Sequence, residues 1–227
     1  MRGSLAGGGP GFLLPAGGRG PTEQTERMTG MAKLLYQGHG SFRITLRDGR
    51  VLYVDPYMGE GYDLPADVVL ITHEHHDHNK LELLTLRPDS VIHRPADMLA
   101  EGEYRTVPLG GGLTVTAVPA YNRNHSREEC VGYLITVDGV TLYAAGDTST
   151  TDAMPGFREL GLDYALLPGD GIYNMDIPEA VRCAELIGAR HTIPIHLKPE
   201  APYDPERAAR FITPSALLVR PGEEIEL

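Results

Sequence analysis

The sequence contains no tryptophan, only two cysteines among 227 residues, and no long apolar run. Cys130 and Cys183 lack Cys-x-x-Cys spacing and are too few for a disulfide framework. We therefore expect buried free thiols in a reducing, cytoplasmic setting. Because no apolar stretch approaches the roughly 20 residues of a membrane-spanning helix, and because the start is unlike a secretory signal, we expect no membrane partner.

Positive charge is also scarce, since 20 Lys and Arg residues face 31 Asp and Glu residues, for a formal net charge of -11. Nucleic-acid binders attract phosphates through a basic surface, which this composition does not provide. We expect no nucleic-acid partner and a small-molecule substrate, and a phosphorylated one stays open. The composition, 41% hydrophobic and 22% charged, is typical of a globular protein. A homo-oligomer is also left open.

Residues 1–30 are rich in glycine and proline and show no periodicity, whereas patterned sequence begins directly after Met31. We expect residues 1–30 to be a flexible tail. The tail is native, a remnant of an expression vector, or the product of a misplaced start codon. Residues 31–227 are expected to form one domain.

Short apolar runs separated by turn residues dominate this region. The dipeptides Asp48-Gly49 and Asp138-Gly139 predict tight hairpin turns. Strands are predicted at 33–36, 42–46, 51–54, 68–71, 113–118, 133–137, 141–145, 164–167, 192–195 and 217–219. Helices are predicted at 178–187 and 205–211, with a short one at 81–84. Strand pairs followed by alternating strands and helices favour a sheet-rich α/β sandwich.

A histidine-rich segment, residues 72–78, follows the apolar strand at 68–71. Residues two apart in an extended chain point the same way, so His73 and His75 are placed to share one metal ion. Asp77 and His78 lie where the chain turns and are placed to face a second ion. Imidazole and carboxylate are ligands that zinc prefers, although manganese and iron also accept them.

Four residues cannot complete two metal sites, because each ion takes roughly four to six ligands. Three further candidates, His125, Asp147 and His196, each follow an apolar strand. Gly146 would let the backbone approach the ions closely. The two oxygens of the Asp147 carboxylate could bridge two cations.

In order and position these residues resemble the metallo-β-lactamase superfamily. The resemblance covers residues 32–200 and rests on Gly38-His39-Gly40-Ser41-Phe42, Val54-Asp55-Pro56-Tyr57, the 73–78 cluster, Gly132-Tyr133, Ala145-Gly146-Asp147-Thr148 and Ile193-Pro194-Ile195-His196. Within the superfamily the chain is most similar to small metal-dependent hydrolases related to L-ascorbate-6-phosphate lactonase. The resemblance implies that residues 31–227 form an αββα four-layer sandwich.

The resemblance also implies the ligand sets. One metal would bind His73, His75 and His125, the other would bind Asp77, His78 and His196, and Asp147 would bridge them. Two divalent ions, zinc before manganese or iron, would activate a hydroxide that cleaves a small ester, lactone, amide or phosphoester. Asp77 would also orient this nucleophile as a catalytic residue. The alternatives are a phosphodiesterase or nuclease, and a non-catalytic metal-binding regulatory module.

Four residues are candidates for substrate binding, each with a rival interpretation. Tyr173 and Asn174 lie in the loop after the strand at 164–167, where ordinary loop packing is the rival. Thr148 could bind the substrate or a ligand carboxylate. His39 lies in a glycine-rich turn, where a purely structural role is the rival.

Overall fold

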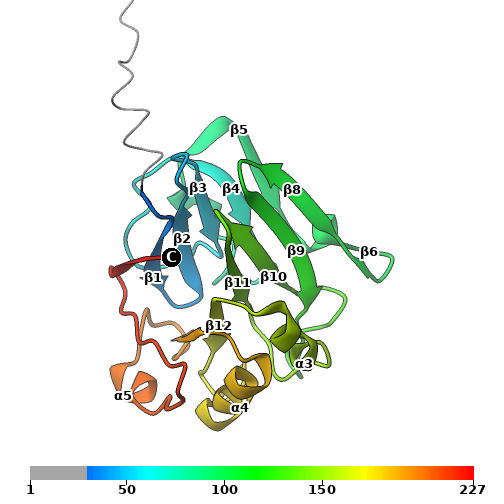
Figure 1. Ribbon diagram of the computed structural model, residues 1–227, viewed down its shortest axis with the longest axis vertical. Helices are drawn as coiled ribbons and strands as arrows, with labels where there is room; N and C mark the ends of the chain where they lie inside the picture. Colours follow the sequence, from blue (N-terminus) through cyan, green and yellow to red (C-terminus); the bar gives the residue numbers. More distant parts are fainter. Residues whose placement is uncertain (1–29) are drawn as a thin grey trace, which may run out of the picture.

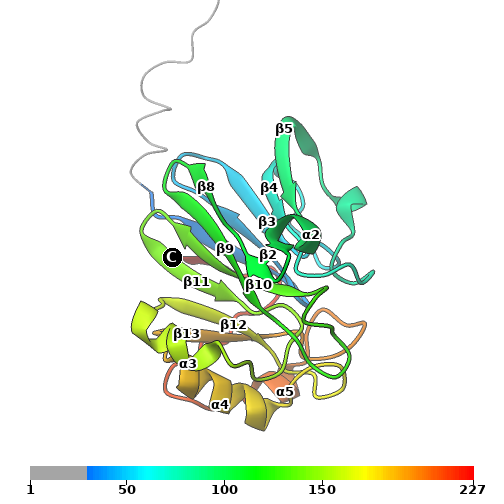
Figure 2. The same ribbon diagram turned by 90° about the vertical axis from the view of Figure 1, so that its right-hand side faces the viewer.

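The computed structural model describes residues 30–227, so the predicted tail lies, apart from Gly30, outside the described residues. Two six-stranded sheets form the body of the molecule (Figure 1 and Figure 2). No helix in the described part of the chain has both the length and the apolar character needed to cross a membrane.

The first sheet has the order β14-β1-β2-β3-β4-β5. Its strands are β1 (Lys33–Gly38), β2 (Ser41–Thr45), β3 (Val51–Val54), β4 (Ala66–Leu70), β5 (Leu86–His93) and β14 (Glu224–Glu226). Strands β14, β1, β2 and β3 pair antiparallel, whereas β3, β4 and β5 pair parallel. Strands β1, β3 and β4 therefore run in the same direction.

The second sheet has the order β13-β12-β11-β10-β9-β8. Its strands are β8 (Thr106–Gly110), β9 (Leu113–Pro119), β10 (Val131–Val137), β11 (Val140–Ala144), β12 (Tyr164–Pro168) and β13 (His191–Ile195). Antiparallel pairing from β8 to β11 changes to parallel pairing from β11 to β13. Strands β9, β11, β12 and β13 therefore share one direction. A small hairpin of β6 (Leu99–Ala100) and β7 (Glu103–Tyr104) precedes this sheet in the chain.

The main core lies between the two sheets, where alternate side chains of facing strands interdigitate. Ile44 and Leu52 of the first sheet belong to the same buried cluster as Val115 and Ile135 of the second. This burial of apolar surface is the main driving force that holds the two sheets together.

Helices cover the outer face of the second sheet, as Figure 2 shows. These are α3 (Met154–Phe157), the 3-10 turn η2 (Arg158–Leu160), α4 (Ile177–Ile187) and α5 (Pro205–Ala208). Helix α4 begins where the Asp176 side chain accepts a hydrogen bond from Glu179 N, and it ends at Gly188 in the left-handed conformation. Its Ile177, Cys183 and Ile187 pack in one cluster with Ala165 and Leu167 of β12.

The outer face of the first sheet has a thinner cover. Val51, Tyr53 and Val69 pack there against Tyr62 and Leu64 of a loop, and against residues in and beside the 3-10 turn η1 (Leu81–Leu83). A further short helix, α2 (Pro95–Met98), follows β5. The layered arrangement confirms the predicted α/β sandwich of two central sheets.

One predicted strand is wrong. Residues 217–219 form no strand, because only Ala216 bridges to Thr192 and Leu217 N donates to Thr192 O. The last helix is shorter than predicted, ending at Ala208. Strands β5, β8 and β14 were not expected from the sequence.

Candidate metal centre

Functional side chains gather at one edge of the two sheets, beyond the carboxyl ends of the strands that share a direction. His39 follows β1, Asp55 follows β3, and His73 lies three positions after β4. From the second sheet come residues that follow β9, β11, β12 and β13, namely His125, Asp147, Asp170 and His196. The fold thus brings together all seven metal ligands predicted from the sequence.

The candidate ligand atoms form two main groups. In the first, atoms of His73, His75 and His125 all lie within 4.8 Å of one another. In the second, the same limit holds for His39, Asp77, His78 and His196. The two groups correspond to the predicted ligand sets, with His39 as an additional member of the second.

Asp147 lies between the groups and turns one carboxylate oxygen toward each. Its Oδ2 is 3.3 Å from His125 Nε2, whereas its Oδ1 is 3.3 Å from His78 Nε2 and 3.6 Å from His196 Nε2. Ligands around a tetrahedral ion with bonds of about 2.0–2.1 Å lie roughly 3.3 Å apart. The spacing therefore matches that of atoms converging on metal ions.

Several of these atoms are buried without a hydrogen-bond partner. They are the Nε2 atoms of His73, His78 and His196 and the Oδ1 atom of Asp147. A buried polar atom left unsatisfied costs about 1–3 kcal/mol. Metal ions bound at this edge would satisfy these atoms, so the residues present fit a dinuclear centre.

The far nitrogens of the histidines are held by other groups. Nδ1 of His78 lies 2.9 Å from Asp55 Oδ2, and Nδ1 of His125 lies 2.9 Å from Asn122 Oδ1. Nδ1 of His196 lies 3.1 Å from Asp170 Oδ2, an ion-pair contact without hydrogen-bond geometry. Such contacts fix the ring orientation and leave Nε2 for a metal.

Asp55 supports both groups of ligands at once. Besides contacting His78, it accepts hydrogen bonds from the Thr72 backbone N–H at 2.8 Å and the Thr72 hydroxyl at 2.6 Å. The same hydroxyl lies 3.1 Å from His73 Nδ1. One buried carboxylate therefore positions a histidine in each group.

Sequence reasoning missed Asp55, Asp170 and Asn122 as supporting residues. A usable signal was present for two of them, because Asp55 follows β3 directly and Asp170 lies two residues after β12. The same position after a buried strand identified Asp147. Asn122 carries no comparable signal.

The backbone at three of these strand ends is left-handed. His39, Asp55 and His196 are each the first residue after a strand, and their φ angles are 54°, 46° and 44°. This conformation is costly for residues other than glycine and persists where surrounding contacts impose it, which is common at functional sites.

Burial and charge set the protonation of the cluster. Burial alone would raise the pKa of Asp147, but His196 and His78 outweigh it and hold the pKa well below its usual value. Burial likewise opposes ionisation of Asp77, yet the hydrogen bond from His39 leaves its pKa lowered. Burial lowers the pKa of His73 and of His125. Near neutral pH these groups are thus in the states that bind metals.

His78 and His196 behave differently from His73 and His125. Burial would lower the pKa of each ring, but Asp147 outweighs it, with Asp55 beside His78 and Asp170 beside His196. Their pKa values are therefore raised.

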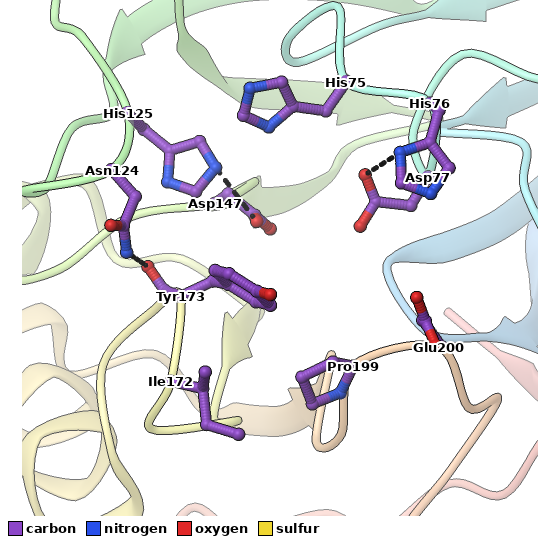
Figure 3. Close-up of a pocket in the computed structure, with 10 residues that line it drawn as sticks. All are labelled: His75, His76, Asp77, Asn124, His125, Asp147, Ile172, Tyr173, Pro199 and Glu200. Carbon is purple, nitrogen blue, oxygen red and sulfur yellow. Dashed lines mark hydrogen bonds and ion pairs between the residues drawn. The ribbon is translucent and has the colours of Figure 1, made fainter.

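A cavity of about 650 Å³ opens over the cluster (Figure 3). Metal-ligand candidates line one side of it, and Ile172, Tyr173, Pro199 and Glu200 line the other. His76 also lines the cavity, near Asp77. Substrate would reach the candidate ions through this cavity.

Of the four candidate substrate contacts, Tyr173 lines the cavity. His39 is buried, with its ring centroid 3.7 Å from that of His196 and its Nε2 3.4 Å from Asp77 Oδ2. Thr148 accepts a hydrogen bond from Tyr121 N, and Asn174 donates one to Asp170 Oδ2. Direct substrate binding by His39, Thr148 or Asn174 stays a prediction.

Comparison with known proteins identifies the family. A family model described as a β-lactamase superfamily domain matches residues 33–196. The chain belongs to the metallo-β-lactamase superfamily. This superfamily member is 32% identical to a protein of Methanoculleus marisnigri named UPF0173 metal-dependent hydrolase, over 86% of this chain and 96% of that one. A protein of Thermococcus kodakarensis with the same description is 29% identical, over 87% of this chain and all of the other.

Solved structures show the same fold. A novel metallo hydrolase from Ignicoccus hospitalis superposes with a TM-score of 0.68 at 24% identity, covering 87% of this chain and 98% of the other. A putative metal-dependent hydrolase from Parabacteroides distasonis also gives 0.68, at 25% identity, covering 84% of this chain and 93% of the other.

Proposed function

We propose that this chain, a metal-dependent hydrolase of the metallo-β-lactamase superfamily, binds two divalent metal ions and hydrolyses a small ester, lactone, amide or phosphoester. His73, His75 and His125 would hold one ion. Asp77, His78 and His196 would hold the other, and Asp147 would contact both. When bound, two such metal ions supply an activated water nucleophile and polarise the bond under attack.

The observation that carries the proposal is the position of Asp147. Its two oxygens point to different groups of histidines, at 3.3 Å from His125 on one side and from His78 on the other. A carboxylate so placed is a natural bridge between two cations. The buried, unpartnered nitrogens beside it support the same reading.

Asp77 is the residue best placed to orient the water nucleophile. It lines the cavity, and its Oδ2 is 3.4 Å from His39 Nε2. That contact holds the carboxylate in place and keeps its pKa low. An ionised Asp77 can accept a hydrogen bond from water at the cavity floor and orient it toward a substrate carbonyl or phosphoryl centre.

Zinc is the ion we propose first, because a histidine-rich set with few carboxylates suits it, with manganese and iron as alternatives. We also propose a cytoplasmic location. Both cysteines are buried free thiols in the structure, which is compatible with a reducing compartment.

The proposal is tested by metal analysis and a substrate panel. Protein loaded with zinc, manganese or iron is assayed on generic esters, lactones, amides, phosphomonoesters and phosphodiesters, alongside Asp147→Ala. We expect two metal ions per chain, turnover of at least one class, and loss of most metal and nearly all turnover in the variant. Full metal occupancy in Asp147→Ala would contradict the bridging role, and bound metal with no turnover would favour a non-catalytic module.

A further inference from the structure

The wall of the cavity opposite the metal ligands carries apolar side chains that are partly exposed. Ile172 is 49% exposed and Tyr173 is 51% exposed, and Pro199 lies beside them. Figure 3 shows Tyr173 projecting into the cavity toward the metal-ligand side, with Ile172 and Pro199 below it. We call Ile172, Tyr173 and Pro199 the apolar wall.

The loop that bears Ile172 and Tyr173 is held firmly, even though their side chains are exposed. Asp170 Oδ1 accepts hydrogen bonds from the backbone N–H groups of Ile172 at 2.6 Å and Tyr173 at 2.7 Å. The Tyr173 carbonyl accepts from the side chains of Asn122 at 3.0 Å and Asn124 at 2.9 Å. The apolar wall is therefore pre-organised, as a binding surface for an apolar group should be.

The lining of the cavity carries acidic side chains but no lysine or arginine. Glu200 is the only carboxylate among its lining residues apart from the proposed metal ligands. Three cationic side chains lie near the cavity without lining it. Arg123 donates to the Ile172 carbonyl at 3.0 Å, Lys80 lies 5.3 Å from the centre of the Tyr57 ring, and the exposed Lys198 precedes Pro199. An anionic substrate group would find no side-chain cation on this wall.

Glu200 lines the cavity from the side opposite the metal ligands and lies below His76 and Asp77 in Figure 3. Its backbone is left-handed, with a φ of 53°, so the loop holds it in an uncommon conformation. Within the described residues, no basic side chain comes within 4.0 Å of its carboxylate, the ion-pair distance. This carboxylate is free to pair with a cation on a ligand.

We infer that the substrate is an ester, lactone or amide with an apolar portion that lies on the apolar wall, an ammonium group that pairs with Glu200, and no anionic group. This inference rests on the proposed function, since the metal ions would bind the group under attack. It narrows that function to substrates without a phosphate or carboxylate on the portion that lies over the apolar wall, because such groups pair best with arginine or lysine.

Binding of hexanoyl hydroxamates to the metal-loaded protein tests the inference without turnover. The hydroxamate binds the ions, and the far end is an ammonium, a methyl or a carboxylate group. Calorimetry should rank the affinities ammonium, then methyl, then carboxylate. Each step should be about two- to fivefold, the size expected for an exposed ion pair.

Variants distinguish the effect of the Glu200 charge on ligand binding from the effect of the protein's overall negative charge. Glu200→Gln should abolish the preference for ammonium over methyl, and Glu200→Lys should make the carboxylate ligand bind best. The matched control Glu159→Gln, at an exposed position in η2, should keep the wild-type ranking. Tyr173→Ala should weaken all hexanoyl ligands but leave acetohydroxamate, which is too short to reach the wall, unchanged.

The outcomes distinguish this inference from the proposed function. Equal affinities, or tighter binding of the carboxylate ligand by the wild-type protein, would overturn the substrate class. So would faster turnover of a phosphorylated or carboxylated substrate than of its ammonium counterpart. If the hydroxamates follow the expected ranking but no ester, lactone or amide is hydrolysed, the proposed function fails while the binding preference stands.

Discussion

At the scale of single residues, side chains outside the proposed ligand set position the candidate ligands. Asp55 is the clearest case, because it contacts Nδ1 of His78 and, through the Thr72 hydroxyl, reaches His73. Asp170 does the same for His196. These contacts determine which nitrogen of each ring faces the site.

Asp55→Asn should weaken metal binding about 10- to 100-fold, the usual effect of removing a carboxylate behind a metal-binding histidine. The amide keeps an oxygen for the Thr72 N–H but loses the charge that fixes the His78 ring. Competition with a chelating dye measures the affinity. Asp89→Asn, on an exposed stretch of β5, is the matched control and should bind metal like the wild type. Equal affinity in the two variants would show that Asp55 has no supporting role.

The candidate metal ligands could be located from sequence because they follow apolar strands, and the structure places them together. His125, Asp147 and His196 could be found one by one in this way. Asn122 could not, since its bond to His125 depends on a loop conformation that no local pattern encodes. Tyr173 was also predicted beside the substrate, whereas Glu200 was not, because it lies in a loop after β13 where its own backbone is left-handed.

At the scale of secondary-structure elements, the turn after β11 decides where Asp147 sits. Gly146 has a φ of 62°, and a Cβ atom there would lie 2.8 Å from the Thr72 Cβ. The turn therefore presses against the segment after β4, which carries the histidine cluster. This close contact joins the carboxyl ends of strands in the two different sheets.

Gly146→Ala should lower the free energy of unfolding by about 1–3 kcal/mol, because it combines a left-handed backbone with a steric clash. It should also weaken metal binding by displacing Asp147. Chemical denaturation and metal titration measure the two effects. Gly156→Ala is the control, since a Cβ atom there, in α3, would meet nothing within 4 Å. A variant at Gly146 as stable as this control would contradict the account.

Elements at the sheet edges were the hardest to predict. Strands β5 and β8 are outer strands of their sheets, and each contains a proline, Pro88 or Pro108. A proline within an apolar run argues against a strand at the level of sequence. The central strands were predicted well because burial on both faces makes them continuously apolar. Residues 217–219 have that same apolar character, but the one bridge in this region joins Ala216, just before them, to Thr192 of β13.

At the scale of the whole molecule, the two sheets have the same order of strand directions. Strands of both sheets therefore end at the same edge, where the candidate metal centre lies. Each sheet changes from antiparallel to parallel pairing along its length. Composition and periodicity predicted a sandwich, and the two hairpin turns predicted the neighbours β2 and β3, and β10 and β11. The other neighbours were not predicted, because strand pairing is a long-range property that local patterns do not specify.

Metal ions should stabilise the entire fold, because the buried nitrogens and the carboxylate of the centre lack other partners. At free metal concentrations near 100 times the dissociation constant, binding adds about 2.7 kcal/mol. This should raise the unfolding temperature by roughly 5–10 °C over chelator-treated protein. Differential scanning calorimetry measures the shift. Asp147→Ala should show little of it, and an equal shift in wild type and variant would place the stabilising ions elsewhere.

The central claim is a dinuclear centre bridged by Asp147, and anomalous diffraction from crystals of zinc-loaded protein tests it most directly. Two zinc peaks about 3.5–4 Å apart are expected. One should contact His73, His75 and His125, the other Asp77, His78 and His196, and Asp147 should contact both. A single peak, or two peaks without Asp147 between them, would contradict it.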